Sequence, residues 1–220
     1  MALSKVVNNS IESVDAAKLS GTIADARFPA TLPAISGANL TNMAGGGAWT
    51  LINTAVASNS SSLTITGLDS TYDTYAIAIS DMVPSTNNAY LQMQLGDSNG
   101  LDTGGTDYTY HCSNSSNDST AYVGQQSFGN VWIRLPGPVG SGAGEGIGGI
   151  LHLNRPGDGT TRPIISGTMT FISGYSTHYG NGGQVIGTRT AVIAVDRVGV
   201  HFSAGNIASG RMTVWGISHA

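Results

Sequence analysis

A short glycine-rich segment, residues 173–183, gathers side chains of the types that bind hydroxyl-rich ligands. It contains Tyr175, His178, Tyr179 and Asn181, which are three rings and one amide. Proteins bind sugars through aromatic faces together with hydrogen bonds from amides and carboxylates. Exposed loops on a rigid sheet scaffold are common positions for binding residues. The segment therefore predicts a binding site for a sugar, formed by these four residues.

A second group of rings consists of Tyr108, Tyr110 and Tyr122, of which the first two share one face of an expected strand. These are secondary candidates for the same role. The alternative for both groups is packing within hairpins or between subunits, because Tyr is also common at protein interfaces. The three tryptophans lie inside apolar strands, which predicts that they belong to the core; they are Trp49, Trp132 and Trp215.

The acidic residues give no sign of catalysis. Most lie in turn-like settings, such as Asp69 and Asp158 beside glycine, where the carboxylate caps its own backbone. Cleavage of a glycosidic bond requires two acids that face that one bond. The sequence also has no G-x-S-x-G motif, which would position a serine nucleophile. We therefore predict that the protein is not an enzyme and has no catalytic residues.

No cofactor or metal site is predicted either. Residues 144–149 fit G-x-G-x-x-G, but a strand rather than a helix follows, which favours a flexible inter-strand loop. His111 and Cys112 are neighbours on an expected strand and point to opposite faces, so Cys112 is interpreted as a small buried hydrophobe. Residues 97–102 are rich in oxygen ligands but lack EF-hand spacing. A hairpin loop is expected there, with calcium binding as the alternative.

The elements that would position these residues are short strands. Apolar and polar residues alternate in several segments, for example residues 63–66 and 91–95, which buries one face of a sheet. Many short strands separated by turn residues indicate an all-β, antiparallel β-sandwich of jelly-roll-like type. The expected strands are residues 49–56, 63–66, 74–80, 90–95, 108–112, 131–135, 149–153, 164–172, 185–188, 191–195, 200–203 and 211–217.

The N-terminal residues have a different character. Residues 9–19 have helical spacing of apolar side chains and predict one short helix. Residues 19–42 form a weak two-copy repeat whose prolines exclude a continuous helix, which predicts an extended trimeric stalk. Residues 45–47, all glycine, are expected to be a hinge. The predicted organisation is an anchor and stalk over residues 1–48 and a β-sandwich head over residues 49–220.

Composition limits the possible partners. Charged residues are 10% of the 220 residues, against about 25% in an average soluble protein. The cations are scattered without a basic stripe, which argues against nucleic acid. No apolar run reaches the roughly 18 residues that a membrane helix needs, so no membrane insertion is expected. The start lacks a secretory signal, which suggests release by lysis.

Two segments resemble a known class of proteins. Residues 19–29 (LSGTIADARFP) and 32–42 (LPAISGANLTN) resemble the stalk repeats of bacteriophage tail fibres and related virion fibres. Residues 65–79 and 205–217 look like the opening and closing strands of the C-terminal β-sandwich of such proteins. The resemblance implies a non-enzymatic homotrimeric fibre whose distal domain contacts a host surface.

We therefore expect a structural fibre protein of a bacteriophage virion, namely a tail fibre, made in the host cytoplasm. Its head would bind a host surface glycan or protein without catalysis, and residues 1–48 would dock on another virion structural protein. Two alternatives remain, a capsid head-fibre or decoration protein without a receptor role, and a glycan depolymerase.

Overall fold

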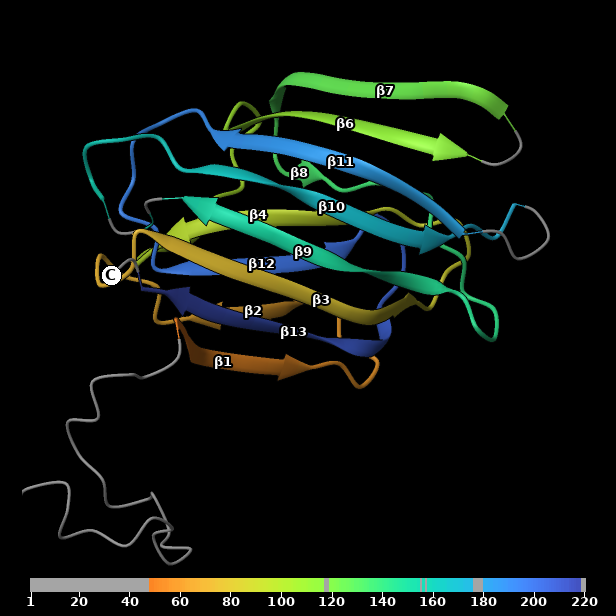
Figure 1. The fold of residues 1–220 in the computed structure, drawn as a ribbon, viewed down its shortest axis with the longest axis horizontal. Helices are drawn as coiled ribbons and strands as arrows, with labels where there is room; N and C mark the ends of the chain where they lie inside the picture. The colour runs from red at the N-terminus through yellow and green to blue at the C-terminus, as the bar shows by residue number, and fades with distance from the viewer. Residues whose placement is uncertain (1–47, 117–118, 155, 157, 176–179, 219–220) are drawn as a thin grey trace, which may run out of the picture. The chain divides into compact units, whose positions relative to one another are not determined.

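The computed structural model describes residues 48–116, 119–154, 156, 158–175 and 180–218. These residues form two stacked antiparallel β-sheets (Figure 1). The all-β antiparallel prediction is thus confirmed. The expected helix over residues 9–19, the stalk over residues 19–42 and the hinge at residues 45–47 lie outside the described residues.

The larger sheet has eight strands in the order β1-β13-β3-β9-β10-β11-β6-β7. Figure 1 shows it with β7 at the top and β1 at the bottom. Its strands are β1 (Trp49–Val56), β13 (Ile207–Ile217), β3 (Thr74–Pro84), β9 (Gly146–Asn154), β10 (Ile164–Ile172), β11 (Gly180–Arg189), β6 (Tyr108–Ser116) and β7 (Ser119–Asn130).

The smaller sheet lies behind the larger one in Figure 1 and has the order β2-β12-β4-β5, with β8 paired to β4. The bounds of its strands are β2 (Leu63–Thr66), β12 (Arg197–Phe202), β4 (Leu91–Asp97), β5 (Gly100–Leu101) and β8 (Ile133–Arg134). The β4–β5 connection is the expected hairpin, in which the Asp97 carboxylate accepts a hydrogen bond from the Asn99 amide at 2.8 Å.

The core lies between the inner faces of the two sheets. Alternate residues of the strands point inward, such as Leu63 and Ile65 on β2 or Ile165 and Met169 on β10, and all are buried. Gly187 on β11 allows a close approach, because a Cβ there would lie 2.7 Å from Ile133 of β8. Burial of such apolar surface is the main stabilising contribution.

Cys112 and His111 behave as predicted. Cys112 is fully buried on the inner face of β6, whereas His111 is exposed on the opposite face. Burial raises the pKa of the Cys112 thiol to about 11. The thiol is therefore protonated and unreactive in the folded protein.

Three expectations from the sequence are wrong. Residues 191–195 are not a strand; the chain crosses between the sheets there and Val195 is buried as part of that crossing. The three tryptophans are not part of the buried core. Trp49 is 46% exposed, because β1 is the edge strand, and its ring lies on the outer side against Trp215, with ring centroids 6.0 Å apart. Residues 146–149 belong to β9 and are not an inter-strand loop.

His201 on β12 makes the stability depend on pH. Its ring packs edge-on against Trp132, with centroids 6.2 Å apart, and burial lowers its pKa. Above the ordinary histidine pKa of about 6.5, the imidazole is neutral in both the folded and unfolded states. Below that pH the unfolded chain binds a proton more readily than the folded chain, so the free energy of unfolding falls.

We expect His201→Gln to remove this dependence. Urea titrations between about pH 7 and pH 5 should show a flatter stability profile for the variant than for the wild type. Ser61→Asn, which changes an exposed residue without a titratable group, is the control and should keep the wild-type slope. Equal slopes for the two variants would contradict the assignment.

Candidate functional site

The sandwich has two ends that differ in their connection to the rest of the chain. The entry end contains the start of β1 at Trp49, which pairs with Ile217, and the chain leaves it toward residue 47. The far end, on the right in Figure 1, is made by the turns at residues 57–62, 85–90, 140–145, 173–175 and 203–206.

The turns of the far end are joined by short polar side chains. Ser85 Oγ accepts a hydrogen bond from the Asn206 amide at 2.8 Å, and the Asn206 side chain donates to the Asn59 carbonyl at 3.2 Å. Asn87 Oδ1 accepts from the Ser141 amide at 3.2 Å. A Cβ on Gly174 would collide with the Asn87 side chain. Segments distant in sequence thus form one connected polar surface.

A hollow of about 370 Å³ lies beside these turns, against β9, β10 and the start of β11. Asp81, Glu145 and Thr170 provide its polar side chains, and glycines leave much of its wall as bare backbone. Glu145 also accepts a hydrogen bond from the Gly142 amide at 2.5 Å, which holds the 140–145 turn in place. Carboxylates and backbone groups of this kind can hydrogen-bond a ligand that is rich in hydroxyls.

Asp81 faces this hollow because β3 is irregular at that point. Its φ is +49°, and the pairing of β3 with β9 shifts between Ile79 and Met82. Such a bulge changes the direction of a side chain relative to the regular alternation of the strand. The sequence gives no sign of this bulge. The sequence shows Glu145 as a single carboxylate among glycines, but it does not show that Glu145 and Asp81 line the same hollow.

The four residues of the predicted sugar site do not stay together. Tyr175 lies on the far-end turn after β10 and is 70% exposed. Asn181 is buried in β11, where it pairs with Phe171 of β10. His178 and Tyr179 lie outside the described residues. Of the described members, only Tyr175 is available at the surface.

The secondary candidates are placed differently. Tyr108 and Tyr110 share the inner face of β6, but Tyr108 is fully buried and Tyr110 packs partly buried against the core. Tyr108 is therefore not a surface ring. Tyr122 lies in β7, where its backbone pairs with Ser115 of β6.

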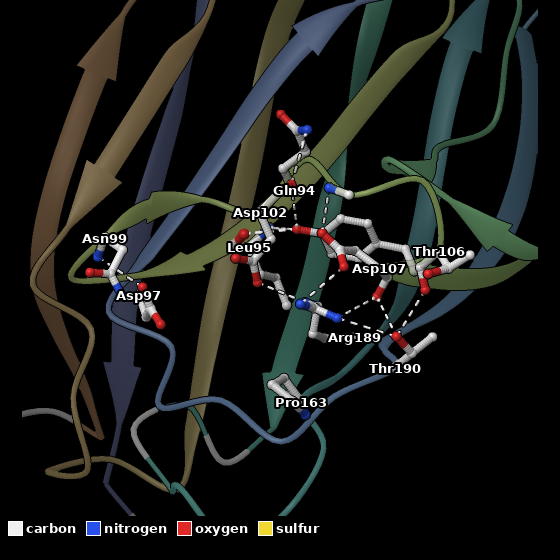
Figure 2. Close-up of polar contacts among 12 residues, drawn as sticks. Gln94, Leu95, Asp97, Asn99, Asp102, Thr106, Asp107, Pro163, Arg189 and Thr190 are labelled. Atoms are coloured by element: carbon white, nitrogen blue, oxygen red, sulfur yellow. Dashed lines mark hydrogen bonds and ion pairs between the residues drawn. The ribbon is translucent and has the colours of Figure 1, made fainter.

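The hydroxyl of Tyr108 connects the two sheets. It donates to the Leu95 carbonyl at 2.8 Å and accepts from the Leu95 amide at 2.9 Å. It is also 3.2 Å from the carbonyl of Asp102, which Figure 2 labels in a polar cluster with Asp107 and Arg189. Burial raises the pKa of Tyr108, so the hydroxyl stays protonated and keeps donating.

The same cluster contains two carboxylates that share one guanidinium. Arg189 Nε lies 2.7 Å from Asp102 Oδ2, and its Nη2 lies 3.1 Å from Asp107 Oδ1. Arg189 also donates to the Asp107 carbonyl and the Thr190 hydroxyl, both at 3.2 Å. Both acids are thus paired with a cation, which gives the cluster a role in holding the 102–107 loop.

Two acids that were expected to cap turns do so. The Asp69 carboxylate accepts a hydrogen bond from the Thr71 amide, and the Asp158 carboxylate accepts one from the Thr160 amide.

Comparisons of the chain with protein families, with curated proteins and with solved structures found no match. Within the described ranges, no three His, Cys, Asp or Glu side chains converge so as to hold a metal ion. The described part of the chain also contains no helix of the length and apolarity needed to cross a bilayer.

Arg189→Met tests the polar cluster. Removing the guanidinium leaves Asp102 and Asp107 largely buried without a counter-charge, at 22% and 19% side-chain exposure. We expect a loss of about 2–3 kcal/mol in the free energy of unfolding, measured by urea denaturation. The matched control is Arg162→Met, at an exposed arginine, which should cost less than about 0.5 kcal/mol. Similar losses in both variants would refute the role assigned to the cluster.

Proposed function

We propose that the chain is a structural fibre protein of a bacteriophage virion whose β-sandwich head binds a host surface glycan without catalysis. The observation that carries this proposal is the position of Tyr175. This exposed ring lies on the end of the sandwich opposite Trp49, among turns joined by hydroxyl and amide groups. In a fibre head, the end of the sandwich opposite the first strand is the part that we expect to reach a surface.

The chemistry of the far end suits a carbohydrate. The exposed ring of Tyr175 offers a face for the apolar side of a sugar. Ser85 and Asn87 present exposed hydroxyl and amide side chains there, and Asp81 and Glu145 line the neighbouring hollow. These groups sit on turns between paired strands, so their positions are set by the sheets. Weak contacts of this kind become useful when several heads act together.

The proposal includes the finer features expected from the sequence. The head is jelly-roll-like, the fibre is a homotrimer, and residues 1–48 supply a short helix, a stalk and a docking segment for another virion protein. The protein is made in the host cytoplasm and released by lysis with the virion. The resemblance of residues 19–42 to fibre stalk repeats supports these features.

Tyr175→Ala tests the receptor role. With the full chain labelled fluorescently, we expect staining of susceptible bacterial strains to fall at least about tenfold, as expected for loss of an aromatic anchor. The thermal unfolding midpoint should not change, because the ring is 70% exposed. Val192→Ala, which removes an exposed apolar group at 45% exposure from the β11–β12 connection, is the control.

The outcome separates the remaining functions. Unchanged staining by Tyr175→Ala would reject the site. A wild-type protein that stains no strain would favour a capsid decoration protein over a receptor-binding fibre. Shortening of surface polysaccharide by the wild type would favour a depolymerase.

A further inference from the structure

The outer face of the eight-stranded sheet is unusual for a surface in water. We define the outer face by the outward-pointing residues of its central rows, which the register of the strands places side by side. One row runs Leu51, Trp215, Ala76, His152, Ser166, Ile186, His111 and Gln126. The row on one side of it contains Trp49, Ile217, Thr74, Asn154, Ile164, Thr188 and Thr109. The row on the other side contains Thr54, Thr213, Ala78, Ile150, Thr168, Gln184 and Ser113.

These rows contain no Asp, Glu, Lys or Arg. Large apolar side chains take positions that a solvated sheet face gives to polar residues. Leu51 and Ile186 are each 59% exposed, Trp49 and Ile164 each 46%, and Ile150 is 42% exposed. Threonine, serine and glutamine fill most of the remaining positions. The three rows therefore combine exposed apolar side chains with neutral polar ones, and the next row of the sheet brings in Arg211, which pairs with Val56 and Ser80.

A shallow hollow marks one side of this face. It has a volume of about 190 Å³, lies over β6, β7 and β11, and is lined by Ile186, His111 and Phe128 among others. Phe128 is 82% exposed, the highest value among the exposed large hydrophobic residues. Side chains of this type contribute strongly to protein interfaces when they become buried.

The outer face is large enough for a stable interface. Eight strands spaced about 4.8 Å apart, with the three rows spanning about six residues of each strand at about 3.4 Å, cover roughly 800 Å². A stable interface buries about 800 Å² of each partner.

We infer that the outer face packs against the same face of other copies of this chain. A charged partner would bury its own charges against a face that offers no counter-charge, which is costly. A second copy brings a surface of the same apolar and hydroxyl composition, and every contact between copies is then apolar or a neutral hydrogen bond. This inference names the surface by which the proposed fibre associates.

The arrangement leaves the far end free. Strands β1, β3 and β10 run from the entry end toward the far end within the face. Copies that pack through the middle of this face bury Ile150 and Ile186, while the turn that carries Tyr175 lies beyond the strand ends. Association and receptor contact thus use different residues, and one can fail without the other.

Cysteine labelling in the full chain tests coverage of the face. We compare Ile186→Cys with Val192→Cys, which replace aliphatic side chains of similar exposure on and off the face, at 59% and 45%. The native Cys112 is fully buried and contributes little background. Packing between copies predicts that a maleimide reacts at least about tenfold more slowly at position 186. Light scattering on the same samples should give a multiple of 22.5 kDa.

Two further variants show what covers the face. Ile186→Glu places an unpaired charge between copies, so it should lower the molar mass in solution. If the copies stay together, it should still restore fast maleimide labelling at position 150 in a chain that also carries Ile150→Cys. Val192→Glu should change neither. Equal labelling rates at positions 186 and 192 would overturn the inference. Slow labelling at position 186 in a protein that is monomeric would also overturn it, because residues 1–47 of the same chain would then be the cover. Loss of cell staining with intact association would reject only the receptor role.

Discussion

The position of one sheet on the other depends on a polar cluster at the entry end. Tyr108 of β6 bonds both backbone groups of Leu95 in β4, and Arg189 of β11 holds Asp102 and Asp107 on either side of it. In surroundings of low dielectric these bonds are strong, and an unpaired member would be costly. Apolar packing brings the sheets together, but it has little direction. The cluster fixes which strand lies over which.

Strand positions could largely be read from the sequence because alternation is a local property. The bounds of β1, β2 and β10 were predicted as the structure has them. β7 was missed because an edge strand needs few apolar residues, and Gln125 and Gln126 carry no strand signal. Residues 191–195 have the alternation of a strand but cross between sheets, since Thr190 is held by the Asp107 carbonyl.

The candidate site could be predicted only in part, since it depends on contacts between distant segments. Exposure of Tyr175 followed from its position in a polar turn. The inward direction of the Asn181 side chain could not be predicted, because β11 begins earlier in the chain than its apolar residues indicate. The hydrogen bond that the Ser141 amide donates to Asn87 joins positions 54 residues apart. No local pattern shows such a meeting, nor the bulge that turns Asp81 outward.

The lack of charge on the outer face has a consequence for the conditions under which the protein works. Ions in solution screen interactions between charges, with a Debye length of about 8 Å at physiological ionic strength. Contacts through Leu51, Ile150 and Ile186 contain nothing for salt to screen. Apolar association instead weakens on cooling, because its driving force near room temperature is entropic. Association through this face, as proposed above, would therefore depend little on salt and would weaken on cooling.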